Sequence, residues 1–206
     1  TTSSLSFVDL APPKGRLRYW VAAINPAGVE GEPALVELAA TGLLGNISTR
    51  GLVGRGDQVM IGGFIVRDGP VRVLLRAKGP SLPVPGALLD PQLTLFRGAT
   101  AIAANDDAPA GMENGPSDPR ESAIATTLDP GEYTAIVRGA GDTTGIALIE
   151  VFAFGSAGAL VNLSTRGDVR IGDQVLIGGF IIRDQPTKVV IRAIGPDLTR
   201  RGVAGA

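Results

Sequence analysis

The stretch GDQVMIGGFIVRD, residues Gly56 to Asp68, returns almost unchanged as GDQVLIGGFIIRD, residues Gly172 to Asp184. The lead into each copy is also repeated, as NISTRG and then as NLSTRG. The two copies are offset by 172 − 56 = 116 residues. A period of this length indicates tandem whole domains, because the units of solenoid proteins run about 20–50 residues.

Strand patterns surround this repeat. QVMIGGFIV and VRVLLRA are rich in aliphatic and β-branched residues and are bounded by Gly, Asp and Pro. Residues 92–105 predict a hairpin around Gly98, and Pro130-Gly131 marks a turn between two more strands. No segment keeps a helical period over several turns. We therefore expect an all-β fold, an antiparallel, jelly-roll-like β-sandwich module in tandem, flanked by partial β domains.

The repeat also predicts the domain boundaries. Residues 43–158 form one complete unit, and residues 159–206 form the first part of a second copy, less than half of it. Residues 1–40 match neither copy. Because a repeated feature belongs to the fold unit, we expect Val59, Ile61, Phe64 and Ile65 to pack like their counterparts 116 residues later.

Composition excludes several function classes. The chain has no Cys and no His, which removes disulfides, thiolate zinc sites and His-based catalytic triads. No other catalytic motif is present, so we expect no enzymatic activity. The net charge of −1 argues against a nucleic-acid partner. The most apolar window, Gly145–Leu163, contains Glu150 and predicts a buried strand rather than membrane insertion.

Asn105, Asp106 and Asp107 are the best candidates for a metal site. Adjacent carboxylate and amide oxygens in one loop supply part of the shell that Ca²⁺ requires. Glu113, Asp118 and Glu121 are close in sequence. The alternative is a solvated acidic loop, because Asn and Asp favour turns without any metal.

Two other repeated motifs have structural and functional interpretations. The STRG motif offers Ser48, Thr49 and Arg50, which suit a carboxylate or a sugar. The structural interpretation is the stronger one: Arg50 and Asp57, repeated as Arg166 and Asp173, form a stabilising pair within one copy. The IGGF motif lacks the helix and Lys-Ser/Thr of a phosphate loop, so its glycines indicate a bulge or a close backbone approach.

Within residues 1–40, the stretch from Ser6 to about Leu38 resembles the last two strands of a fibronectin type III domain. The resemblance is carried by the segment LRYWVAAINPAGVEGEPALVEL, Leu17–Leu38. The shared pattern is Y-x-V-x-A-x-N-x-x-G. The resemblance implies that the alternating residues are core and that none is catalytic.

Residues 88–154 are similar to bacterial pre-peptidase C-terminal domains, through NDD after a hairpin and PGEYTAIVRG before a closing strand. Those domains are jelly-roll sandwiches of secreted enzymes and surface proteins. The whole unit also resembles a tandem module of long bacterial surface proteins. The resemblance implies an extracellular or cell-surface location in a bacterium, and it favours calcium at the NDD loop.

A half-module exposes apolar faces and strand edges unless something covers them. We therefore expect a structural protein that polymerises with itself, its subunits completing one another head to tail by strand addition into a filament or surface array. The interface would include Val175, Ile177, Phe180, Val189 and Ile191. The alternative is a non-catalytic module of a larger secreted hydrolase or adhesin that binds calcium or surface glycans.

Overall fold

The structure is a computed structural model. It describes residues 43–155, 158–184, 186–200 and 202–203, together with the backbone of two N-terminal strands. These two strands, β1 (Leu17–Val21) and β2 (Ala34–Leu38), pair antiparallel with Leu17 opposite Leu38. The rest of the fibronectin-like segment lies outside the described residues.

Ten further strands form one antiparallel sheet. They are β3 (Leu43–Val53), β4 (Met60–Arg67), β5 (Val71–Lys78), β6 (Pro91–Arg97), β7 (Thr100–Asn105), β8 (Ser122–Leu128), β9 (Gly131–Gly139), β10 (Gly145–Phe154), β11 (Ala159–Arg166) and β12 (Ile177–Arg183). Three 3-10 turns (Gly56–Gln58, Ala140–Asp142, Gly172–Gln174) and one helical turn, α1 (Pro196–Thr199), complete the elements of this part. The predicted all-β antiparallel class is confirmed.

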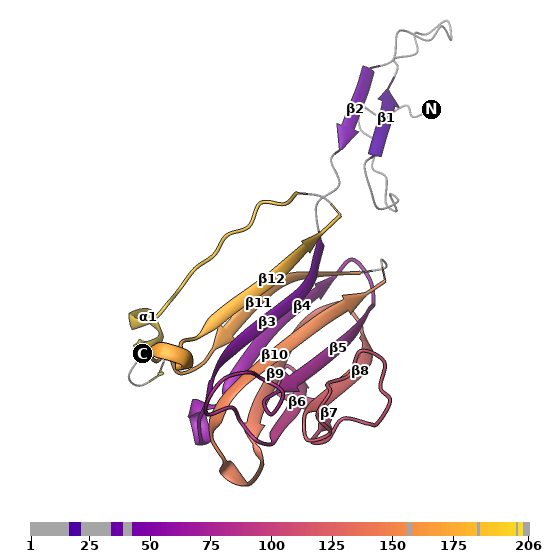
Figure 1. The fold of residues 1–206 in the computed structure, drawn as a ribbon. Helices are drawn as coiled ribbons and strands as arrows, with labels where there is room; N and C mark the ends of the chain where they lie inside the picture. The colour runs from indigo at the N-terminus through magenta and orange to yellow at the C-terminus, as the bar shows by residue number, and fades with distance from the viewer. Residues whose placement is uncertain are drawn as a thin grey trace, which may run out of the picture.

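The sheet is nearly closed into a barrel (Figure 1). The strand order is β7-β6-β9-β4-β11-β3-β10-β5-β8, with β12 attached to β3, and the end strands β7 and β8 contact each other. The predicted hairpin around Gly98 is confirmed, with Arg97 opposite Thr100 and Gly98 at φ 58°. By contrast, β8 and β9 follow each other in sequence but pair with different strands.

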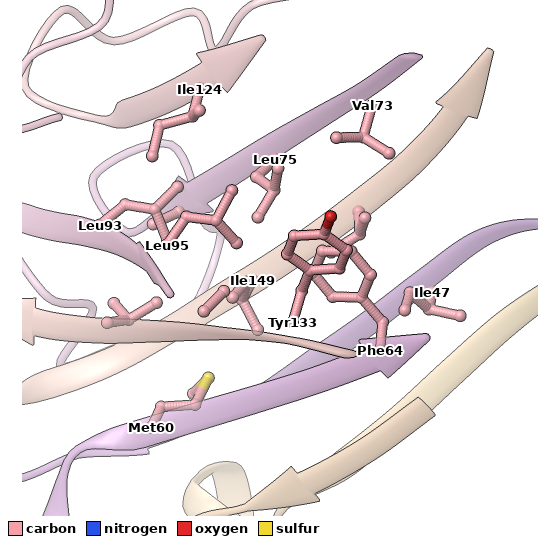
Figure 2. Close-up of a cluster of buried hydrophobic side chains, with 14 of the residues drawn as sticks. Ile47, Met60, Phe64, Val73, Leu75, Leu93, Leu95, Ile124, Tyr133 and Ile149 are labelled. Atoms are coloured by element: carbon pink, nitrogen blue, oxygen red, sulfur yellow. The ribbon is translucent and has the colours of Figure 1, made fainter. Parts of the chain in front are cut away.

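One hydrophobic core fills the inside of the curled sheet (Figure 2). Alternate residues of β4 are buried, as the period-two geometry of a strand requires. Phe64 on β4 stacks on Tyr133 of the neighbouring β9, with ring centroids 5.6 Å apart. Apart from Met60, the other members of this core cluster are aliphatic. Glu150, the charge inside the apolar window, forms a 2.6 Å ion pair with Arg76 on the adjacent β5.

Candidate assembly surface

The two copies of the repeat exchange strands. β3 belongs to the first copy, yet it pairs with β12 of the second copy, while β11 of the second copy pairs with β4 of the first. The registers correspond residue for residue. Thr49 lies opposite Gly178, and its counterpart Thr165 lies opposite Gly62, the counterpart of Gly178. Each ladder therefore repeats the other under the offset of 116 residues.

Irregularities are repeated as well. The β11–β4 ladder skips Val161, and the β12–β3 ladder skips Gly45, the residue at the same position of the first copy. A bulge bends its strand and fixes the pairing register. The two ladders thus bend at the same point, so the same strand pairing occurs twice in the structure.

Residues at the same position of the two copies also contact each other. Leu44 lies opposite Leu160 where β3 and β11 meet, and the hydroxyl oxygens of Thr49 and Thr165 are 2.7 Å apart. A residue touches its own counterpart only near a two-fold axis. Strands β3, β4, β11 and β12 are therefore related by a local two-fold axis that passes between β3 and β11.

Glycines allow the backbones of the exchanged strands to approach each other closely. A Cβ built on Gly63 would lie 2.5 Å from Ser164 Oγ, and one built on Gly179 would lie 2.8 Å from Ser48 Oγ. These pairs are counterparts of each other. The repeated IGGF motif thus marks a close approach, as its glycines indicate, and the approach is between the two copies rather than within one.

The arginines of the STRG motif do not form the expected pair. Among the described residues, Arg50 makes no ion pair with Asp57. Instead, Arg166 of the second copy donates from Nη2 to the carbonyl oxygen of Asp57 in the first, at 3.3 Å. The interpretation of Arg50 and Asp57 as a pair inside one copy is wrong, because the two strands of the motif are exchanged.

The expected equivalence of packing is wrong at β12. Phe64 is 2% exposed, whereas its counterpart Phe180 is 39% exposed. The physical reason is the number of neighbours: β4 is paired on both edges, with β11 and β9, while β12 among the described residues pairs with β3 alone. The core-facing side of β12 consequently lies open.

The predicted interface residues lie on this exposed part of the chain. Val175 follows the turn Gly172–Gln174 and is half-buried, and Ile177 and Phe180 are exposed on β12. Val189 and Ile191 lie in residues 186–195, which form no strand. Their counterparts Val73 and Leu75 are fully buried, but Ile191 itself is 77% exposed. None of these five residues belongs to the hydrophobic core that the described residues form.

The Asn105 loop is held by hydrogen bonds of its own. Asn105 Oδ1 accepts from the Ala123 amide at 2.8 Å, and its Nδ2 donates to the Asp107 carbonyl at 2.9 Å. The Asp106 carboxylate accepts from Gln92 Nε2 at 3.2 Å. The second bond of Asn105 is the local turn contact expected of Asn without a metal. Within the described residues, no three acidic side chains gather so as to hold a metal ion.

Two acidic residues near this loop, Asp90 and Asp118, have pKa values shifted in opposite directions. Partial burial raises the pKa of Asp90, and the charges of Asp106 and Asp107 raise it further. The hydrogen bonds of Arg120 to Asp118 lower the pKa of the Asp118 carboxyl. The surroundings of Asp90 therefore oppose its charge, whereas those of Asp118 favour the charged carboxylate.

Glu121, considered above as a possible metal ligand, is fully buried instead. Its Oε1 accepts from the amides of Gly79 and Ser81, both at 2.9 Å, and so fixes the turn after β5. A buried carboxylate requires such donors, because burying an unpaired charge is costly. Nothing in the sequence pattern distinguishes Glu121 from a surface acid.

Within the described residues, no helix has the length and apolar character needed to cross a membrane. The sequence matches no known protein-family model, and it matches no curated protein sequence.

Proposed function

We propose that this chain is an extracellular structural protein of a bacterial surface, a self-assembling unit of a filament or surface array. Its modules are jelly-roll-like sandwiches arranged in tandem, and neighbouring modules complete each other by exchanging strands. The partner is another copy of the same module. The resemblances to secreted tandem modules and to pre-peptidase C-terminal domains support the location and the architecture.

The observation that carries this proposal is the exposed apolar surface of β12 and the residues after it. Eight large hydrophobic residues of this surface are exposed: Ile177, Phe180, Ile181, Ile182, Val189, Val190, Ile191 and Ile194. Burying one such side chain stabilises a fold or an interface by about 1.5–3 kcal/mol. Exposed apolar surface on this scale favours a protein interaction site.

The exchange seen between the two copies supports strand addition as the mechanism. Main-chain bonds provide affinity in such joints, and alternate side chains provide register. The joint between β3–β4 and β11–β12 is two-fold, so it closes on itself and is not the head-to-tail contact expected above. Growth beyond one pair of copies then depends on the open side of β12.

The test is the mass of the chain in solution, measured by sedimentation over a range of concentrations and checked by electron microscopy. We expect concentration-dependent association that Phe180→Lys abolishes. Ile171→Lys is the matched control, because Ile171 is 90% exposed but lies outside β12. A chain that stays monomeric at every concentration would rule out self-assembly and favour the calcium- or glycan-binding module.

A further inference from the structure

The partner of β12 can be inferred from the pairing of β4. In the first copy, β4 has β11 on one edge and β9 on the other. In the second copy, β12 has β3 on the edge that corresponds to β11, in the same register. The remaining edge of β12 therefore corresponds to the edge of β4 that β9 occupies.

We propose that the open edge of β12 binds a β-strand with the sequence pattern of β9, contributed by another copy of the module. The strand runs antiparallel to β12, with its Tyr133 opposite Phe180 and its Glu132 opposite Ile181. This register is the one in which Phe64 faces Tyr133 and Ile65 faces Glu132 in the complete copy. The inference rests on the proposed function and names the segment that joins the subunits.

Side-chain sizes fit this occupant. Phe64 stacks on Tyr133 in the complete copy, and Phe180 lies on the corresponding face of β12 with 39% of its surface exposed. Gly62 lies opposite Ala135, and a Cβ added at its counterpart Gly178 would meet no atom within 4 Å. The small residues Gly178 and Ala135 therefore leave room for the two strands to approach, while the aromatic rings cover the open apolar face.

The experiment uses the full chain, which contains no cysteine of its own. Ile181→Cys places a thiol on β12, and a synthetic peptide of residues 129–139 carries Glu132→Cys as a thionitrobenzoate mixed disulfide. Directly opposite residues of an antiparallel pair have Cβ atoms about 4.5–5.5 Å apart, whereas diagonal ones are about 7–8 Å apart. We expect rapid disulfide formation, followed by thionitrobenzoate release and by mass.

Three controls define the result. A peptide with Thr134→Cys in place of Glu132→Cys should react several-fold more slowly, because its thiol lies on the diagonal. Adding Ala135→Pro to the Glu132→Cys peptide should abolish its faster reaction, because proline removes a hydrogen-bond donor from the strand ladder. The chain with Ile171→Cys, a position that is exposed but outside β12, should react at the same rate with both cysteine peptides.

Equal rates for both cysteine peptides would overturn the inference, as would a disulfide that joins two Ile181→Cys chains to the exclusion of the peptide. Register-selective reaction supports it even if the chain is monomeric at every concentration, an outcome that would overturn only the proposed self-assembly. Association of the chain without register-selective reaction would overturn the inference and leave the proposed function standing.

Discussion

The hydroxyl oxygens of Thr49 and Thr165 lie 2.7 Å apart, and the two residues are separated by 116 positions, one full period of the repeat. Thr49 is buried, and Thr165 is half-buried. This hydrogen bond between counterparts lies close to the axis that relates the two copies, so the two copies are in direct contact. The first strands of the second copy belong to the same sheet as the first copy.

This hydrogen bond should couple the two threonines. Thr165→Val leaves the buried hydroxyl of Thr49 without its partner and should cost about 1–3 kcal/mol of unfolding free energy. Thr49→Val leaves a hydroxyl that water reaches and should cost about 0.5–1.5 kcal/mol. The double variant should cost less than the sum of the two. Urea denaturation of the four proteins measures this, and strict additivity would show that the two hydroxyls do not interact.

The glycine contacts distinguish exchanged strands from unexchanged ones. Gly63→Ala should clash with Ser164 Oγ, and Ser164→Ala should relieve that clash, since the Ser164 Cβ lies 3.8 Å from the added atom. We expect a coupling of about 0.5–3 kcal/mol between these two changes in a double-mutant cycle.

The matched control for this cycle is Gly63→Ala combined with Ser48→Ala. If strands of the same copy paired with each other, Ser48 would take the place of Ser164. We expect no coupling in the control, measured by urea denaturation, because Ser48 faces Gly179 in the observed pairing. Coupling to Ser48 instead of Ser164 would contradict the exchange.

Much of the fold follows from local pattern. The alternation in QVMIGGFIV predicts a strand with one buried face, and β4 buries Met60, Phe64 and Val66. The turn at Gly98 is predicted because glycine readily adopts the positive φ that the hairpin requires. Pairing between distant strands is a different matter. Nothing in the pattern of β8 and β9 shows that they join different neighbours, because period-two alternation is the same for any partner.

The candidate surface could be predicted only in part. The repeat identifies the apolar residues that need a partner, Phe180 and Ile191 among them. It does not reveal that β11 and β12 pair with β4 and β3, because a repeated sequence fits a partner from its own copy or from the other equally well. That ambiguity made Arg50 and Asp57 look like a pair, although it is Arg166 that contacts Asp57.

Phenylalanine removal should affect the two copies unequally. Phe64→Ala opens a cavity in the core and should cost about 3–5 kcal/mol. Phe180→Ala, at low protein concentration, should cost about 0.5 kcal/mol or less, as at other exposed positions. Urea denaturation at several protein concentrations measures both. A cost at Phe180 that rises with concentration would report the docked partner, and equal costs at high dilution would show that β12 is already covered within one chain.

Calcium should have little effect on this chain. The amide of Asn105 is occupied by Ala123 and Asp107, and the described residues hold no cluster of three acidic groups. A ligand that binds the folded state raises its stability, so a calcium site would show itself in the melting temperature. We expect the same melting curve in a chelator and in millimolar calcium. A higher melting temperature in calcium that Asp106→Asn abolishes would establish the site at residues 105–107.

Asp90 should make the chain less stable as the pH rises. Its folded-state pKa is raised above the ordinary value of 3.8 by burial and by its acidic neighbours, and its Oδ1 is buried without a hydrogen-bond partner. The folded state therefore holds this proton more tightly than the unfolded state. The resulting stability is fully present below the unfolded-state pKa and is lost as the pH rises through the folded-state pKa.

Asp90→Asn removes the charge and should therefore raise the melting temperature at pH 7, while the variant and the original chain should converge near pH 3. Because Asp90 is only partly buried, the gain should stay below about 2–4 °C, the shift that 1 kcal/mol produces in a chain of this size. Asp118→Asn is the matched control. Arg120 lowers the pKa of Asp118, so the loss of this carboxylate should not stabilise the chain at pH 7. Melting curves between pH 3 and pH 7 measure both, and an Asp90→Asn gain that is the same at both ends of this range would show that the raised pKa is not its cause.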